Sequence, residues 1–240
     1  MTGVLVAILG GVNSPVIFAS AGALDGQLDD GAGLFTLTPG APAGVGIGNL
    51  LFLQVQVFAA GASLFVSVTT PSGWTNVASL TDAGPDHALS LFYRWATGTA
   101  DDTPTVTAAN DATAATSVAA ARLYRFSGGL GSGDPRDGPA GAFQAASTTL
   151  NAQDITTTTV DALACQFVGV FSYAGATGSF TGETGTDYTE VATANTTVGA
   201  DMTMQLQVGT KPVAGAITGG TYTLGSSQVK AVAAFGLKAG

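Results

Sequence analysis

The sequence predicts an all-β protein, an antiparallel and jelly-roll-like β-sandwich built from two similar halves. Polar and apolar residues alternate with the period of two that strands show, and turn-forming Gly, Pro, Asn and Asp recur about every eight to twelve residues. The chain also resembles itself at an offset of about 113 residues. No window of helical length carries an apolar stripe at i, i+3 and i+4. We therefore expect about a dozen strands or more, arranged as a sandwich or barrel.

The composition limits the classes of partner. Of the 240 residues, 46% are hydrophobic and 10% are charged, whereas about a quarter of an average soluble protein is charged. The net charge is −9 and the seven Lys and Arg residues are scattered, which opposes binding to phosphate backbones, so we expect no nucleic-acid partner. Thr, Gln and Ser fill the polar positions of the predicted strands, and we expect them on a solvent-facing side.

Residues 1–44 are expected to form an N-terminal arm and the first strands. The opening "MTGVLVAILGGVNSPVIF" is apolar, but the first cation is Arg94, whereas a secretory signal carries a charged region at its start. Asn13, Ser14 and Pro15 also interrupt the apolar run. We predict a structural strand or arm here, and no membrane partner.

Two further stretches show the strand period clearly. "NLLFLQVQVFAAGASLFVSV" (49–68) is broken by Gln54, Gln56 and two serines, and therefore reads as two strands instead of a bilayer helix. In "ALSLFYRW" (88–95), Tyr93 and Trp95 fall on one face together with two leucines. Trp95 is expected to have a structural role on that face.

The internal repeat defines the domain organisation. "WTNVA" (74–78) returns as "YTEVA" (188–192), which places Trp74 opposite Tyr188, and "LSLFYRWAT" (89–97) falls on "MTMQLQVGT" (202–210). The order of matches predicts a first β half over about 45–128, a crossover segment over 129–159 and a second β half over 160–240. The alternative is chance similarity among Thr- and Ala-rich strands. Each half could supply one sheet or fold as a small sandwich, and we favour one shared domain.

Over about 34–240 the chain resembles a duplicated β-sandwich (jelly-roll-like) family of tailed-bacteriophage virion proteins, also seen in bacterial surface proteins. The segments that carry this resemblance are "PSGWT" (71–75), "LFYRWATG" (91–98), "YRFSG" (124–128), "DPRDGPAG" (134–141) and "ITTTTVDALACQF" (155–167). They are turn and core segments: Pro71 and Gly73 suit a tight turn, and Trp74 would enter the core beside it. The second half has "GTDYT" in place of the Trp turn.

No residue pattern indicates catalysis, and we predict that the chain is not an enzyme. The single His87 has no second His or Cys with which to share a metal, and a Ser-His-Asp triad could be assembled only arbitrarily. The single Cys165 excludes an intramolecular disulfide, and its apolar neighbours predict a small buried side chain.

Aspartates cluster in Gly- and Pro-rich turns, where Asp commonly bonds the local backbone. The alternative is calcium, because "LDGQLDDG" (24–31) and "GDPRDG" (133–138) bring carboxylates close to flexible carbonyls. The calcium candidates are Asp25, Asp29, Asp30, Asp134 and Asp137. No other cofactor is expected.

The resemblance implies a structural virion protein, for which we favour a capsid decoration or cement protein on the phage head surface. Its expected partners are the major capsid protein and copies of itself, in a homo-oligomer such as a trimer. The apolar N-terminal segment would dock on a neighbouring subunit. The alternative is a tail-fibre or adhesin module that recognises a host glycan or protein, with Tyr173 or Tyr222 as stacking platforms. A secreted carbohydrate-active enzyme is disfavoured for want of a catalytic constellation.

Overall fold

A computed structural model describes most of the chain and confirms the all-β class. The described residues are 15–29, 31–59, 66–82, 87–110, 117–129, 131–171, 180–184, 187–196, 198, 202–211 and 213–240. Every strand pairing among them is antiparallel, and the one helical element is a short 3-10 turn, η1 (Ala100–Asp102). No helix in these ranges is both long enough and apolar enough to span a bilayer.

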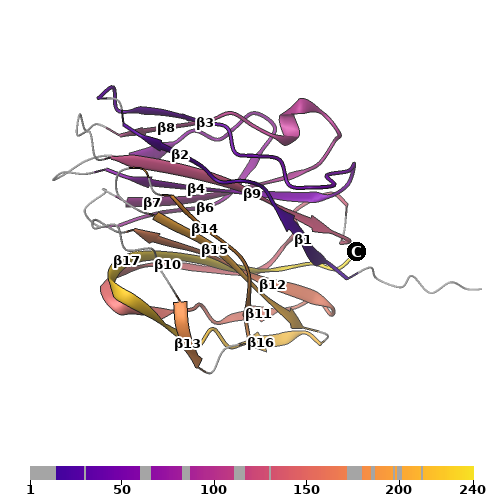
Figure 1. Ribbon diagram of the computed structural model, residues 1–240. Coiled ribbons are helices and arrows are strands. Elements are labelled where there is room, and N and C mark those ends of the chain that lie inside the picture. Colours follow the sequence, from indigo (N-terminus) through magenta and orange to yellow (C-terminus); the bar gives the residue numbers. More distant parts are fainter. Residues whose placement is uncertain are drawn as a thin grey trace, which may run out of the picture.

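The first half forms a large sheet and a small one (Figure 1). The order of the large sheet is β1 (Ile17–Ala21), β9 (Val118–Ser127), β4 (Leu50–Phe58), β7 (His87–Trp95), β6 (Thr75–Thr81), and β2 (Asp25–Leu28) also pairs with β9. The small sheet has the order β3 (Leu34–Leu37), β8 (Val106–Asn110), β5 (Val66–Val68).

The second half repeats this plan. The order of its large sheet is β10 (Arg136–Asn151), β17 (Thr221–Leu237), β12 (Ala162–Phe171), β15 (Met202–Lys211), β14 (Thr189–Thr196), and β13 (Phe180–Thr184) also pairs with β17. Its small sheet pairs β11 (Ile155–Thr157) with β16 (Gly215–Ile217). Strand for strand, β9-β4-β7-β6 corresponds to β17-β12-β15-β14, so the two similar halves are confirmed.

The two large sheets face each other, with the small sheets outside them, which gives four layers (Figure 1). At one edge β10 lies beside β6, where Arg136 Nη1 donates to the carbonyl of Val77 (3.2 Å). At the other edge β14 lies beside β2, where the Thr196 side chain lies against Gly26. This exchange of edges is what an approximate two-fold axis along the strands produces.

The layers enclose a shared core and separate cores within each half. The shared core lies between the two large sheets, where the Phe52 ring centroid is 5.4 Å from that of Phe167 and 5.2 Å from that of Phe235. Trp74 and Phe92 belong to a second core inside the first half. Smaller apolar clusters lie inside the second half. Each half is therefore a small sandwich and also supplies one sheet to a common one.

The expectation that the glutamines of the strands face solvent is wrong. Gln54, Gln56, Gln166, Gln205 and Gln207 are all buried, because both faces of each large sheet are covered. Gln54 Nε2 donates across the shared core to the carbonyl of Val168 (3.0 Å), and Gln54 Oε1 accepts from the Tyr124 hydroxyl (2.9 Å).

Three of the other four glutamines form a chain inside the second half, whereas the buried amide of Gln56 has no hydrogen-bond partner within the described residues. Gln166 Nε2 donates to Gln207 Oε1 (2.5 Å), and Gln207 Nε2 donates to Gln205 Oε1 (2.6 Å). Amide groups thus satisfy one another here, as buried polar groups must if they are not to cost stability. The polar positions of these strands face protein, and solubility depends on other residues.

Residues 129–159 do more than connect the halves. They contain β10, which pairs along β17, and β11, so that most of the segment belongs to the second half. The end of the apolar opening is also part of the protein's own sheet. Val16 is buried, and the Phe18 ring lies edge-on to Phe126 at 5.8 Å. An arm that docks on a neighbour could therefore include only residues 1–14, which lie outside the described residues.

Candidate functional site

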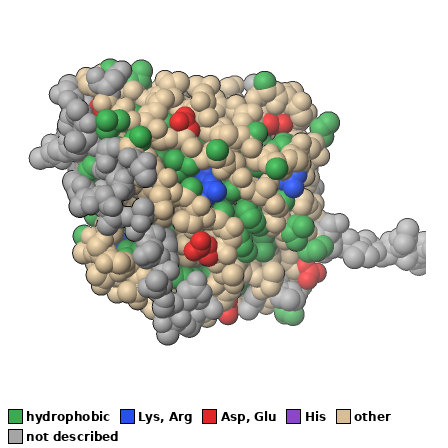
Figure 2. All heavy atoms as spheres, viewed as in Figure 1, with side chains coloured by type: hydrophobic (Ala, Val, Ile, Leu, Met, Phe, Trp, Pro, Cys, Tyr) green, Lys and Arg blue, Asp and Glu red, His purple; other side chains and the backbone are tan. Residues whose placement is uncertain are grey.

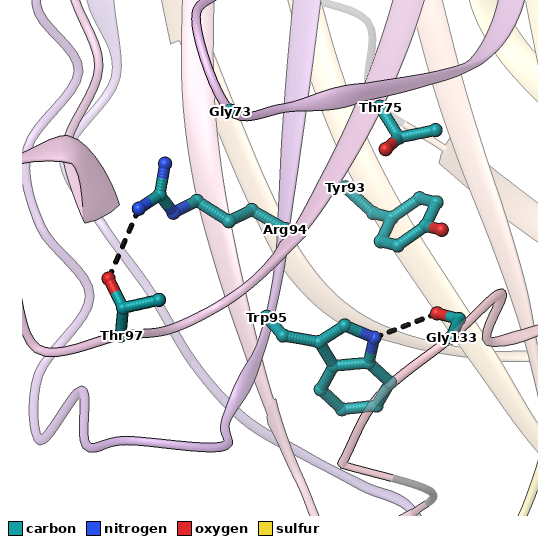
Figure 3. Close-up of a pocket in the computed structure, with 7 residues that line it drawn as sticks. All are labelled: Gly73, Thr75, Tyr93, Arg94, Trp95, Thr97 and Gly133. Atoms are coloured by element: carbon teal, nitrogen blue, oxygen red, sulfur yellow. Dashed lines mark hydrogen bonds between the residues drawn. The ribbon is translucent and has the colours of Figure 1, made fainter.

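An open cleft of about 320 Å³ lies where β6 begins and β7 ends (Figure 3). Its lining residues are Gly73, Thr75, Tyr93, Arg94, Trp95, Thr97 and Gly133. Thr75 pairs with Tyr93 in the sheet, so the last residues of β7 extend past the start of β6. The end of β7 that extends past β6 contributes Arg94 and Trp95 to the lining of the cleft.

Alternation along β7 places its side chains on two walls of this cleft. Tyr93 and Trp95 point toward the shared core, against which both are half-buried, and Arg94 points to the other side (Figure 3). The Trp95 indole Nε1 donates to the carbonyl of Gly133 (2.8 Å), in the segment that leads into β10. The indole is thereby fixed between the two halves of the chain.

The Pro71–Trp74 turn builds the next wall. The backbone N–H of Trp74 donates to the carbonyl of Pro71 (3.1 Å), Gly73 has a φ of +77°, and the Trp74 side chain is buried in the first-half core. Such a φ strains residues other than glycine, and the Arg94 guanidinium lies so close that a side chain at position 73 would collide with it. Tyr188, the counterpart of Trp74, is buried in the second half.

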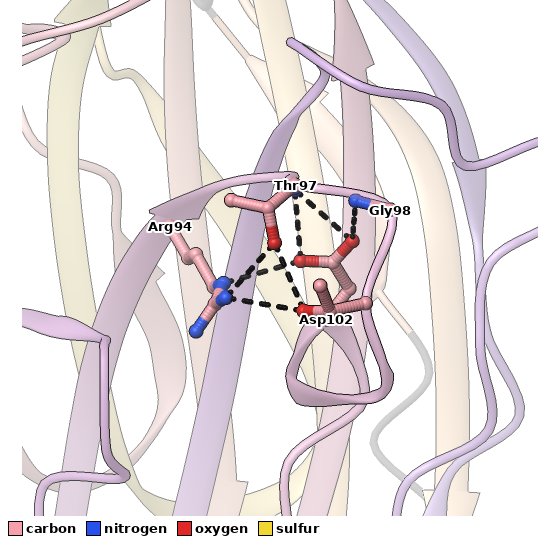
Figure 4. Close-up of polar contacts among 5 residues, drawn as sticks. Arg94, Thr97, Gly98 and Asp102 are labelled. Atoms are coloured by element: carbon pink, nitrogen blue, oxygen red, sulfur yellow. Dashed lines mark hydrogen bonds and ion pairs between the residues drawn. The ribbon is translucent and has the colours of Figure 1, made fainter.

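An ion pair behind the cleft fixes Arg94 (Figure 4). Arg94 Nε lies 3.1 Å from Asp102 Oδ1, and the two side chains are only 11% and 7% exposed. Asp102 also accepts from the backbone N–H groups of Thr97 (3.1 Å) and Gly98 (2.8 Å), and Arg94 Nη2 donates to Thr97 Oγ1 (3.1 Å). One carboxylate therefore holds both the arginine and the loop that follows β7.

Sequence reasoning identified Trp95 and the turn residues but missed Tyr93, Arg94 and Gly133 as parts of one cleft. The repeat held one usable signal, because Trp95 falls on Val208 and Tyr93 on Leu206. Aromatic residues present in one half alone are not required by the duplicated fold. A second cleft on the other side of the turn is lined by small residues: Pro71, Ser72, Ala100, Thr103, Pro104 and Thr105.

The carboxylates of the four described calcium candidates accept hydrogen bonds from the protein. Asp25 Oδ2 accepts from the N–H of Thr38 (2.6 Å), and Asp29 Oδ1 accepts from the N–H groups of Gly31 (2.9 Å) and Gly33 (3.0 Å). Asp134 pairs with the guanidinium of Arg136 at 2.8 Å.

The candidates lie in different parts of the fold, Asp25 and Asp29 by β2 in the first half and Asp134 and Asp137 by β10 in the second. Asp30 is outside the described residues. Within the described ranges, no group of three or more His, Cys, Asp or Glu side chains could hold a metal ion.

Asp137 is buried at the start of β10, where Thr158 and Thr159 surround its carboxylate. Burial raises the pKa of Asp137, but hydrogen bonds from the Thr158 N–H (2.7 Å), the Thr158 hydroxyl (2.8 Å) and the Thr159 N–H (2.8 Å) lower it by more, and the net pKa is below its ordinary value. The charged form therefore stabilises the fold above the unfolded-state pKa, and this contribution is lost as the pH falls through the folded-state pKa.

Asp137→Asn is expected to lower the free energy of unfolding by about 1–3 kcal/mol at pH 7, because an amide NH₂ would face N–H donors. The deficit relative to the unsubstituted chain should begin to shrink below about pH 4, where the aspartate of the unfolded chain becomes protonated, and should vanish once the pH has fallen through the lower folded-state pKa. Urea unfolding at several pH values measures both effects. Asp161→Asn, at an exposed turn position, is the control and should change little. A deficit independent of pH would contradict the assignment.

His87 and Cys165 are both buried inside the protein. His87 Nδ1 lies 2.9 Å from Asp82 Oδ2, and its ring lies between Phe58 and Phe171, with centroids 5.1 and 4.9 Å away. Cys165 is buried in the shared core, as expected, and burial raises the pKa of its thiol.

The two tyrosines considered as stacking platforms are not found on the described surface. Tyr222 is buried against Leu224 and Val232, because β17 turns its ring toward the inside of the second half. The expectation that Tyr222 is a stacking platform is therefore wrong. Tyr173 lies outside the described residues. Comparison of the chain with family models, curated proteins and solved structures gave no match.

Proposed function

We propose that this chain is a structural protein of a tailed-bacteriophage virion, a decoration or cement protein on the head surface. The major capsid protein and further copies of the chain would be its partners. The resemblance described above supplies the class of protein. The structural observation that supports the proposal is a group of exposed apolar side chains at one end of the sandwich, which we call the apolar end.

Four of the seven large hydrophobic residues exposed in the described part of the chain form the apolar end: Ile47, Val213, Ile17 and Val160 are 82%, 70%, 55% and 47% exposed. The other three are Leu34 (54%), Leu28 (45%) and Val198 (37%). Ile47 and Val160 occupy corresponding turns, before β4 and before β12. Both turns lie at the same end, because Trp95 at the end of β7 bonds Gly133, just before β10. Figure 1 places the start of β1 and the C-terminus there as well.

Exposed apolar groups on a chain with so few charges fit a protein surface better than a charged polymer. Figure 2 shows isolated acidic and basic side chains on a surface of mainly neutral atoms. A contact made by these four side chains would be weak by itself. On a symmetric shell it is repeated many times, and linked copies gain avidity without any new contact.

The double substitution Ile47→Asp/Val160→Asp tests the proposal. It should leave the chain folded, because both side chains are largely outside the cores, and should abolish cosedimentation with capsids stripped of the protein. The matched control is Leu28→Asp/Val198→Asp, which alters one exposed apolar residue per half at the opposite end, as Leu28 pairs with Val118 at the start of β9.

Immunogold labelling of particles provides the location. Label over the head together with loss of binding in the first variant alone is the expected result. Label confined to the tail would favour the host-recognition alternative, and equal binding by both variants would overturn the role of the apolar end.

A further inference from the structure

We infer that the cleft between the Pro71–Trp74 turn and Trp95 is a binding site for a neutral saccharide. This inference does not depend on the proposed virion role. It follows from three observations: the aromatic wall, the polar wall with balanced charge, and the absence of the same residues from the second half.

The aromatic wall is formed by Tyr93 and Trp95, two residues apart on one face of β7 (Figure 3). The polar edge of Trp95 is already bonded to the Gly133 carbonyl at 2.8 Å, so the indole is held in one orientation. The ring itself is half-buried and borders the cleft. A fixed aromatic surface of this kind suits the apolar C–H face of a pyranose ring, with little entropy left to lose on binding.

The opposite wall supplies hydrogen-bonding groups. Arg94 and Thr97 border the cleft on the side away from the aromatic rings, and Thr75 borders it beside Tyr93 (Figure 3). A saccharide presents many hydroxyls that donate and accept. The Arg94 charge is balanced by Asp102 at 3.1 Å. Because the wall carries no uncompensated cation of its own, a neutral ligand fits better than an anionic one. A volume of about 320 Å³ is at the lower end of small-molecule sites, which suits one or two sugar rings.

Comparison with the second half shows whether the fold itself requires the residues of the aromatic wall. Its strand β15 has Leu206, Gln207 and Val208 where β7 has Tyr93, Arg94 and Trp95. These residues of β15 still pack on the shared core or inside the second half, so the duplicated sheet forms without an aromatic pair at this place. The duplicated sheet therefore does not by itself require an aromatic residue at position 95. Within the described residues, β15 offers no counterpart of this aromatic wall.

The two tryptophans provide a direct readout, since Trp74 is buried and Trp95 lines the cleft. The ¹H–¹⁵N spectrum of the full chain should contain two indole signals, of which Trp95→Phe removes one. The probes are glucose, galactose, mannose, N-acetylglucosamine and their β-linked and α-linked oligomers. We expect at least one probe to shift the Trp95 signal saturably and to leave the Trp74 signal in place.

Variants then link the shift to the cleft, with affinity measured by titration calorimetry because the Trp95 variants lack the indole signal. Trp95→Ala should weaken binding of that probe about tenfold or more, Trp95→Phe should retain most of the affinity, and the matched truncation Val208→Ala should have no effect. The Trp74 indole signal and the circular dichroism report whether each variant is folded. If no saccharide moves the Trp95 signal, the inference is overturned. If a proline-rich peptide then does move it, the cleft is a peptide site instead.

Discussion

Phe167→Ala is expected to lower the free energy of unfolding by about 3–5 kcal/mol, the usual cost of removing a buried aromatic ring from a core. Phe167 belongs to the second half, and its ring stacks on that of Phe235, with the ring centroids 5.6 Å apart. Its centroid also lies 5.4 Å from that of Phe52 and 5.5 Å from that of Tyr124, both in the first half. Its loss opens a cavity between the two large sheets, and both halves should lose stability together.

Tryptophan fluorescence makes this prediction specific, because both tryptophans, Trp74 and Trp95, are in the first half. In urea unfolding, Phe167→Ala should lower the midpoint that fluorescence reports by as much as the midpoint that circular dichroism reports. Phe143→Ala is the control, since that ring is only partly buried beside Phe171, and it should cost less. An unchanged fluorescence midpoint would mean that the halves unfold independently.

Asp102→Ala is expected to cost about 3–5 kcal/mol, because it leaves the nearly buried Arg94 guanidinium without its carboxylate partner. The backbone N–H groups of Thr97 and Gly98 would lose their acceptor as well. The loop after β7 should loosen, and the Trp95 indole signal should broaden or shift. Thermal and urea unfolding measure the loss of stability, and the indole signal reports on the cleft.

Two variants test whether the loss of stability comes from burial of the ion pair or only from removal of a charge. Asp134→Ala removes a carboxylate from the pair with Arg136, whose side chains are 50% and 26% exposed, and should cost about 1 kcal/mol or less. Arg94→Met/Asp102→Ala removes both charges and should be more stable than Asp102→Ala by itself. Equal losses for Asp102→Ala and Asp134→Ala would contradict the account of the buried pair.

The strands and their duplication could be predicted because both leave a periodic trace in the sequence. Trp74 and Tyr188 proved to be buried at corresponding places, and the segment 49–68 forms β4 and β5. What covers each face could not be predicted. Gln54 alternates with apolar residues in the same way whether its amide meets water or the carbonyl of Val168, which is 114 residues away.

The cleft could not be predicted for a related reason. Its walls depend on contacts between distant segments: Trp95 with Gly133, and Gly73 with Arg94. Arg94 and Asp102 are close in sequence, but a turn aspartate and a strand arginine are each common, and their spacing does not fix a bond between them. The carboxylates proposed for calcium were placed together by sequence proximity, whereas the backbone donors around them depend on the fold.

The duplicated architecture has a consequence for valency. Two half-length subunits joined by the shared core would separate on dilution, whereas one covalent chain holds its halves at an effective concentration that does not depend on how much protein is present. The two subunits of a homodimer must also carry the same residue at every position. A single chain with a two-fold plan can differ between its halves, as it does at Trp95 and Val208, and so a nearly symmetric body can carry a single, directional feature.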